Sequence, residues 1–260
     1  MTKKQSRATK QAHAQRAAER AAAIRAENER KERRRRTIVV TAVVVGVLTL
    51  VVAIATIVQS GRDTTGESAT PPAGVVDTYG LPRGSDGAPV TVEIYEDFMC
   101  PFCGDLEAAA TDMLVGYVDA GDVQVQYKML SFLDRASDGS DYSTRAMNAV
   151  AVVLDAAGPE AAVRLHDLLY ENQPAEGTPG LDDDQLVALA VEAGADAEQV
   201  RGPIEDRAFE GWVKNATDQA DQDGATSTPY VVVNEEPLDQ VPTEQLVADL
   251  EAAIEAAKAE

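Results

Sequence analysis

The sequence VTVEIYEDFMCPFC, residues 90–103, decides the fold of this chain. Its first six residues are mostly β-branched or aromatic and predict a short buried strand. Pro101 suits the first turn of a helix, so we expect a helix from Cys100 to about Ala120. A strand that runs directly into a helix places Cys100 at the helix N-terminus.

The chain has two cysteines, Cys100 and Cys103, separated by Pro101 and Phe102. A zinc site needs about four ligands, and of the two histidines, His13 falls on the far side of the membrane span predicted below. A purely structural disulfide is the second interpretation, but so short a loop gains only about 2 kcal/mol. We favour the third interpretation, a redox pair, and we expect no metal and no cofactor.

The predicted position of Cys100 explains why this spacing suits redox chemistry. The unpaired backbone N–H groups of Phe102 and Cys103 can donate to a thiolate there, and the helix dipole favours negative charge. A lowered pKa makes Cys100 both a nucleophile and a good leaving group. Cys103, one turn later, would resolve the mixed disulfide. We expect the sulfur of Cys100 to be accessible to solvent, with Pro229 beside it.

The rest of the outer region alternates strands with helices. Residues 123–130, VQVQYKML, predict a second strand, and a long helical region follows from about 140 to 223. Residues 230–234, YVVVN, predict a third strand led by Pro229, with a short edge strand and a final helix after it. A cis Thr228–Pro229 bond would leave the Thr228 backbone free to pair with an extended substrate.

The N-terminal quarter is built differently. Residues 1–36 hold 13 Lys or Arg against four Glu, whereas the remaining residues carry a net charge of about −30. Residues 37–58, TIVVTAVVVGVLTLVVAIATIV, lack any charge and as a helix would span about 33 Å, enough to cross a bilayer. We therefore expect an uncleaved signal anchor, followed by a flexible linker over residues 59–77.

The basic arm predicts the orientation of this anchor. Lys and Arg beside a spanning helix stay in the cytoplasm, so residues beyond the span are extracytoplasmic, in an oxidising compartment. The arm has one large apolar residue, Ile24, and no aromatic residue. Contact with anionic lipid headgroups is therefore favoured over binding to nucleic acid.

The sequence VEIYEDFMCPFC, followed far downstream by STPYVVVN, resembles the DsbA-like branch of the thioredoxin superfamily, in particular membrane-tethered forms from high-GC Gram-positive bacteria. The resemblance covers residues 78–258. It implies an α/β thioredoxin domain over residues 78–260, with a helical insertion at about 138–224. It also implies that Cys100 attacks, that Cys103 resolves, that Pro229 is the cis-proline and that Thr228 pairs with substrate.

Two features of the sequence depart from the family pattern. Many relatives carry a buried acid six residues before the first cysteine, where this chain has Ile94; Glu93 takes that role only if the strand bulges, and is otherwise solvated or ion-paired. The Pro–Phe dipeptide lacks the histidine of the strongest oxidases, and Glu96 and Asp97 add negative charge. Both features argue against an extremely low pKa of Cys100.

The resemblance implies a protein thiol–disulfide oxidoreductase that acts on cysteine-containing secreted or membrane proteins. We favour an oxidase, which needs a membrane reoxidant of DsbB or vitamin-K-epoxide-reductase-like type because the predicted span has no cysteine. A reductase or isomerase, and a non-catalytic redox-sensing scaffold, are the alternatives. His166, in RLHDLLY, is expected on a helix surface or at the edge of the core, without a catalytic role.

Overall fold

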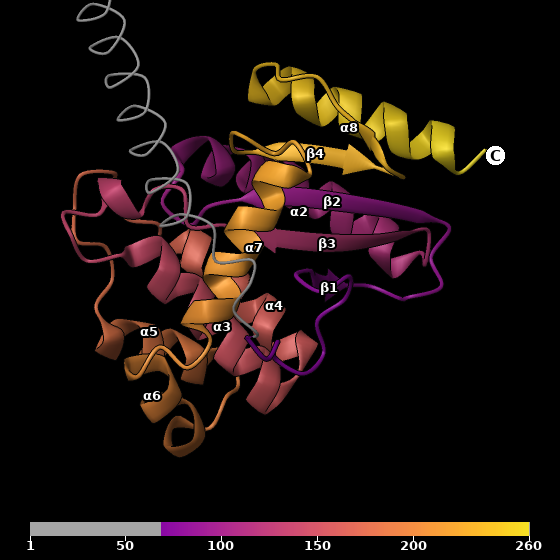
Figure 1. The fold of residues 1–260 in the computed structure, drawn as a ribbon. Helices are drawn as coiled ribbons and strands as arrows, with labels where there is room; N and C mark the ends of the chain where they lie inside the picture. The colour runs from indigo at the N-terminus through magenta and orange to yellow at the C-terminus, as the bar shows by residue number, and fades with distance from the viewer. Residues whose placement is uncertain (1–68, 260) are drawn as a thin grey trace, which may run out of the picture. The chain divides into compact units, whose positions relative to one another are not determined.

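A computed structural model describes residues 69–259 (Figure 1). The elements follow in the order β1 (Leu81–Arg83), β2 (Val90–Glu96), α2 (Pro101–Asp119), β3 (Val123–Met129), α3 (Tyr142–Ala157), α4 (Pro159–Glu171), α5 (Asp183–Glu192), α6 (Ala197–Glu205), α7 (Glu210–Gln222), β4 (Tyr230–Val233), β5 (Glu236–Pro237) and α8 (Thr243–Ala257). A 3₁₀ turn at Asp134–Ala136 precedes α3. The predicted strands and the helix after Cys100 are confirmed, with ends shifted by one residue.

One sheet of five strands, in the order β1-β3-β2-β4-β5, organises the described residues. β2 and β3 are parallel, with Val90 opposite Val123, and β4 pairs antiparallel with β2 on its other side. The sequence missed β1, whose three residues are too few to show a period. The expected short edge strand is β5, and it contains Pro237, whose missing N–H is tolerated at an edge.

Side chains of β2 alternate between two separate cores. Val92 and Ile94 are fully buried in the larger core, which includes residues of α2, α3 and α8. Tyr95 belongs to a smaller cluster with Ala220 of α7, and α7 crosses this side of the sheet in Figure 1. Glu96 lies two residues beyond Ile94 and therefore faces the larger core with it.

Five α-helices, α3 to α7, lie between β3 and β4, in the region where the sequence predicts helices. α3 is the central one, with every residue from Tyr142 to Leu154 buried. α5 begins with a capping box: Asp182 accepts from the Gln185 N–H and the Gln185 side chain accepts from the Asp182 N–H, both at 2.9 Å. Trp212 of α7 is 2% exposed and its indole N–H donates to the carbonyl of Thr78.

The predicted arm over residues 1–36, the span over residues 37–58 and most of the linker over residues 59–77 lie outside the described residues. At the end of the linker, the Ala73 N–H donates to Asp155. Within residues 69–259, no helix is both long and apolar enough to traverse a lipid bilayer.

Candidate active site

Cys100 lies at the junction between the sheet and α2. It is the N-cap residue, with extended backbone (φ −77°, ψ 115°), and Pro101 occupies the first helical position. The carbonyl of Cys100 accepts from the N–H groups of Cys103 at 3.1 Å and Gly104 at 3.2 Å, which starts the helix. The cysteine pair therefore occupies the predicted place.

The carboxylate of Asp97 holds the turn that leads to Cys100. It is fully buried and accepts hydrogen bonds from the backbone N–H of Met99 at 2.9 Å, the backbone N–H of Leu133 at 2.9 Å and the hydroxyl of Ser143 at 2.6 Å. The N–H of Cys100 itself donates to the carbonyl of Asp97 at 2.9 Å. One side chain thus connects the end of β2, the loop after β3 and the start of α3.

Hydrogen bonds to its sulfur lower the pKa of Cys100 from 9.0 to about 6. The largest contribution comes from the thiol of Cys103, and Thr228 and the backbone N–H groups of Cys103 and Phe102 add to it against the opposing effect of burial. The two backbone N–H groups are the donors expected at the helix N-terminus, and the side chains of Cys103 and Thr228 add to them. At neutral pH, Cys100 is therefore mainly a thiolate.

The expected solvent accessibility of Cys100 is wrong for the residue as a whole, because only 4% of its surface is exposed. The Cys100 thiol donates to the Thr228 carbonyl, which lies 3.5 Å from its sulfur. Cys100 nevertheless lines an open cavity of about 430 Å³, together with Phe132, Leu133, Arg135, Glu176, Asp221, Thr226, Ser227 and Thr228. A partner thiol can approach Cys100 through this cavity.

The second cysteine has the opposite electrostatic environment. Cys103 is 1% exposed, and burial, the hydrogen bond to Cys100 and the charges of Cys100 and Glu96 raise its pKa well above 9.0. Both cysteines are free thiols in this structure. Cys100 and Cys103 therefore differ in the way that an attacking and a resolving thiol require.

The other predicted site residues surround this pair. The Thr228–Pro229 peptide bond is cis, as expected, and directly precedes β4. Pro101 is exposed at the start of α2, and the side chain of Phe102 is 65% exposed. Phe102 thus contributes its N–H to the thiolate while presenting an apolar ring to solvent.

Glu93 is not the buried acid of this site. β2 pairs residue by residue with β3 from Val90 to Glu96, without the bulge that the role of Glu93 requires. Glu93 instead lies 3.2 Å from the ammonium group of Lys128 in an ion pair. Ile94 occupies the inward position and is fully buried. The second interpretation, an ion-paired Glu93, is the correct one.

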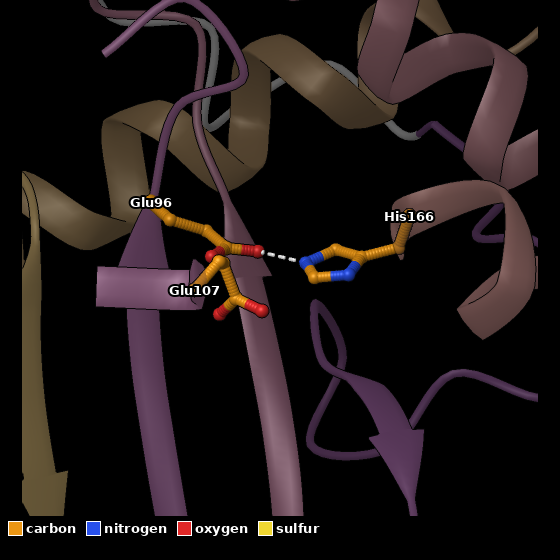
Figure 2. A group of neighbouring side chains, drawn as sticks. All are labelled: Glu96, Glu107 and His166. Carbon is orange, nitrogen blue, oxygen red and sulfur yellow. Dashed lines mark hydrogen bonds and ion pairs between the residues drawn. The ribbon is translucent and has the colours of Figure 1, made fainter. Parts of the chain in front are cut away.

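The buried acids near Cys103 are Glu96 of β2 and Glu107 of α2, and their carboxylates lie close to His166 of α4 (Figure 2). His166 is completely buried, so the expected surface or core-edge position is wrong, and its Nε2 lies 2.5 Å from Glu96 Oε1. Burial and the charge of Glu96 raise the pKa of Glu107 to about 7. Burial alone would lower the pKa of His166, but Glu96 and Asp167 outweigh it and raise the pKa.

Gln173, just after α4, is a positioning residue that the sequence did not reveal. Its amide nitrogen donates to the carbonyl of Phe98 at 3.2 Å and to that of Cys100 at 2.9 Å. Gly104 makes room for this contact, since a Cβ atom there would overlap the Gln173 carboxamide oxygen. The helical segment between β3 and β4 is thereby attached to the backbone of the cysteine pair.

The family model described as Thioredoxin matches residues 77–256, well over half of the chain. The solved structure of reduced DsbA from Mycobacterium tuberculosis is 28% identical, with a TM-score of 0.57, over 70% of this chain and 98% of that one. The chain belongs to the thioredoxin family, and within that family it is similar to the DsbA-type thiol–disulfide oxidoreductases.

Two curated relatives match part of this chain. Na(+)/H(+) antiporter NhaA 3 of Salinispora tropica is 32% identical over 153 residues, which are 58% of this chain and 21% of that protein. The chain thus spans about a fifth of the length of the first curated relatives that it matches. Probable disulfide bond formation protein D of Bacillus cereus is 26% identical over 58% of this chain and 68% of that protein.

Two glycines of α2 test the role of Gln173 in this DsbA-like site. Gly104→Ala should displace the Gln173 amide from the Cys100 carbonyl and destabilise the reduced protein by about 1–3 kcal/mol. Gly116→Ala is the matched control, because a Cβ there meets nothing within 4 Å and should stabilise the helix by about 0.5–1 kcal/mol. Urea unfolding measures both, and equal stabilisation by the two substitutions would contradict the role of Gln173.

The ionisation of Cys100 is measurable from thiolate absorbance in the ultraviolet. In the reduced protein we expect a transition near pH 6, with the thiolate present above that pH and lost below it. Cys103→Ala removes the largest stabilising contact and should raise this pKa, whereas Cys103→Ser retains a hydroxyl donor and should raise it less. A wild-type transition near pH 9, or no shift in Cys103→Ala, would show that the Cys103 thiol does not stabilise the thiolate.

Proposed function

We propose that this chain is a membrane-anchored, extracytoplasmic oxidase that introduces disulfides into secreted or membrane proteins. The lowered pKa of Cys100, to about 6, carries this proposal. Interactions that stabilise the Cys100 thiolate stabilise the reduced form, and a stabilised reduced form makes the corresponding disulfide more oxidising. The relative from Bacillus cereus, whose name refers to disulfide bond formation, adds support.

The reaction would begin with the disulfide between Cys100 and Cys103. A substrate thiolate attacks Cys100 Sγ, which breaks the bond to Cys103 and forms a mixed disulfide, and the buried Cys103 takes up a proton. A second substrate thiolate then attacks the substrate sulfur of that mixed disulfide, and Cys100 leaves as a thiolate. The substrate loses two electrons and becomes a disulfide, while the cysteine pair gains them. The low pKa of Cys100 favours it as the leaving group.

Thr228 is suited to align the substrate for this exchange. Its carbonyl lies 3.5 Å from Cys100 Sγ, and both residues line the same cavity. A chain extended beside residues 226–228 would place its cysteine next to Cys100. Glu176 and Asp221 line the same cavity with Arg135, so charged groups of both signs are available to neighbouring substrate residues.

The anchor and the reoxidant belong to the same proposal. The uncharged residues 37–58 and the basic residues 1–36 support a single-pass anchor with the catalytic domain outside. The chain has no cysteines besides Cys100 and Cys103. Electrons must therefore leave through a separate membrane protein, for which a DsbB or vitamin-K-epoxide-reductase-like partner is suited.

Cysteine variants and the reduction potential test the enzymatic part. Cys103→Ser should trap substrate proteins as mixed disulfides with Cys100, and Cys100→Ser should abolish exchange. A reduction potential of the full chain of about −120 mV would support an oxidase, and a potential of about −270 mV would support a reductase. If neither variant changed the disulfide content of secreted proteins, a scaffold would be the better explanation.

Membrane topology is testable without reference to activity. Single cysteines placed at Ser6 and Ser60 in a Cys100→Ser/Cys103→Ser background, one on each side of the predicted span, report the orientation. In intact cells, a membrane-impermeant maleimide should label the Ser60→Cys variant and not the Ser6→Cys variant. The reverse pattern would place the thiol pair in the cytoplasm, and labelling of both would argue against the anchor.

A further inference from the structure

We propose that Glu96, Glu107 and His166 form a binding site for a divalent transition-metal ion, with Zn²⁺ as the best-suited ion. The three residues come from β2, α2 and α4, and one ligand atom of each lies within 4.8 Å of the other two. Figure 2 shows the Glu96 carboxylate directed at the imidazole of His166, with the Glu107 carboxylate close to both. Three ligands from three elements surround one point in the interior.

Two carboxylate oxygens in this cluster lack hydrogen-bond partners and could coordinate a cation. Glu96 is 1% exposed and Glu107 is 6% exposed, yet Glu96 Oε2 and Glu107 Oε1 have no hydrogen-bond partner. A buried carboxylate oxygen without a partner is costly, because it has lost its water without replacement. A metal ion coordinated by both side chains would satisfy these atoms together.

The surroundings of His166 match those of a metal-binding histidine. Its Nδ1 lies 3.1 Å from Asp167 Oδ1, and Asp167 also forms an ion pair with Arg83. A carboxylate that accepts a hydrogen bond from one ring nitrogen fixes the orientation of the imidazole and leaves its other nitrogen to bind the metal. That nitrogen is Nε2, which faces Glu96.

Metal binding requires only a small local rearrangement. Zn²⁺ bonds of about 2.0–2.1 Å place tetrahedral ligand atoms roughly 3.3 Å apart. His166 Nε2 and Glu96 Oε1, now 2.5 Å apart, must therefore separate by a little under 1 Å. The ion takes the place of the proton between these two atoms, which is released to solvent.

A cavity provides access to the cluster from the surface. It has a volume of about 300 Å³, lies between α2 and α4, and is lined by Gly104, Glu107, Ala108, Thr111, Asp112, Asp167, Tyr170 and Glu171. Four of these side chains are acidic, which concentrates cations at the opening. An ion can thus reach Glu107 without the molecule unfolding.

The ligand types indicate which ion fits. One imidazole with two carboxylates suits Zn²⁺ and its first-row neighbours better than Ca²⁺ or Mg²⁺, which take oxygen ligands alone. The site contains neither cysteine, although the charge of Glu96 acts on Cys103. A bound ion would therefore lie on the buried side of the redox pair and leave Cys100 free.

The experiment measures Zn²⁺ binding to the full-length chain in detergent, in its oxidised form so that no free thiol competes. We expect one equivalent of Zn²⁺ to remain after dialysis and calorimetry to show a single saturable site. Glu107→Gln and His166→Gln should each weaken binding at least tenfold. Glu93→Gln is the control, because Glu93 lies on the same strand but outside the cluster and pairs with Lys128.

A second measurement covers the case in which a variant does not fold. X-ray absorption of the Zn²⁺-loaded wild-type chain should show a shell of oxygen and nitrogen with one imidazole and no sulfur. Absence of stoichiometric Zn²⁺ in the oxidised wild type would overturn the proposal. Equal weakening by Glu93→Gln, or unchanged affinity in folded Glu107→Gln, would overturn it too, because the ion would then bind the acidic surface.

Discussion

The buried hydrogen bonds of Asp97 hold the short turn between β2 and α2, and the geometry of the redox site depends on that turn. Its carboxylate accepts from Met99, Leu133 and Ser143, so the segment before Cys100 is connected to the loop after β3 and to α3. With the turn held, Cys100 can lie only at the first turn of α2, where unpaired N–H groups meet its sulfur. The hydrogen bonds of Asp97 thus set the environment of the Cys100 thiol without contacting its sulfur.

Burial and one hydrogen bond give the two cysteines different pKa values. The thiol of Cys103 donates to the sulfur of Cys100, which lowers the pKa of Cys100 and raises that of Cys103. Burial is the largest cause of the raised pKa of Cys103, which is one of the buried residues of α2, whereas Cys100 borders an open cavity. Of the two cysteines, Cys100 is therefore the one that is ionised at neutral pH, as the proposed exchange requires of its leaving group.

Local patterns in the sequence predicted the parts of the site that lie close together along the chain. A β-branched strand, Pro101 and the cysteine spacing were enough to place Cys100 at the start of a helix. Glu96 and Glu107 were not predicted as buried acids, although the period of a strand places Glu96 on the same face as Ile94 and the period of a helix places Glu107 one turn after Cys103. His166 and Gln173 had no such signal, because only the packing of α4 against the sheet brings them to the site.

The role of α4 gives the helical segment between β3 and β4 a function beyond covering the core. α4 carries His166 and Asp167, and Gln173 follows it directly, so one helix contacts the buried acids and also the carbonyl of Cys100. The Gln173 contact acts on the backbone of Cys100, and Glu96, which contacts His166, acts on Cys103. A shift of α4 would change both surroundings at once. A thioredoxin domain without this segment would have to hold its cysteine pair by the sheet and α2 alone.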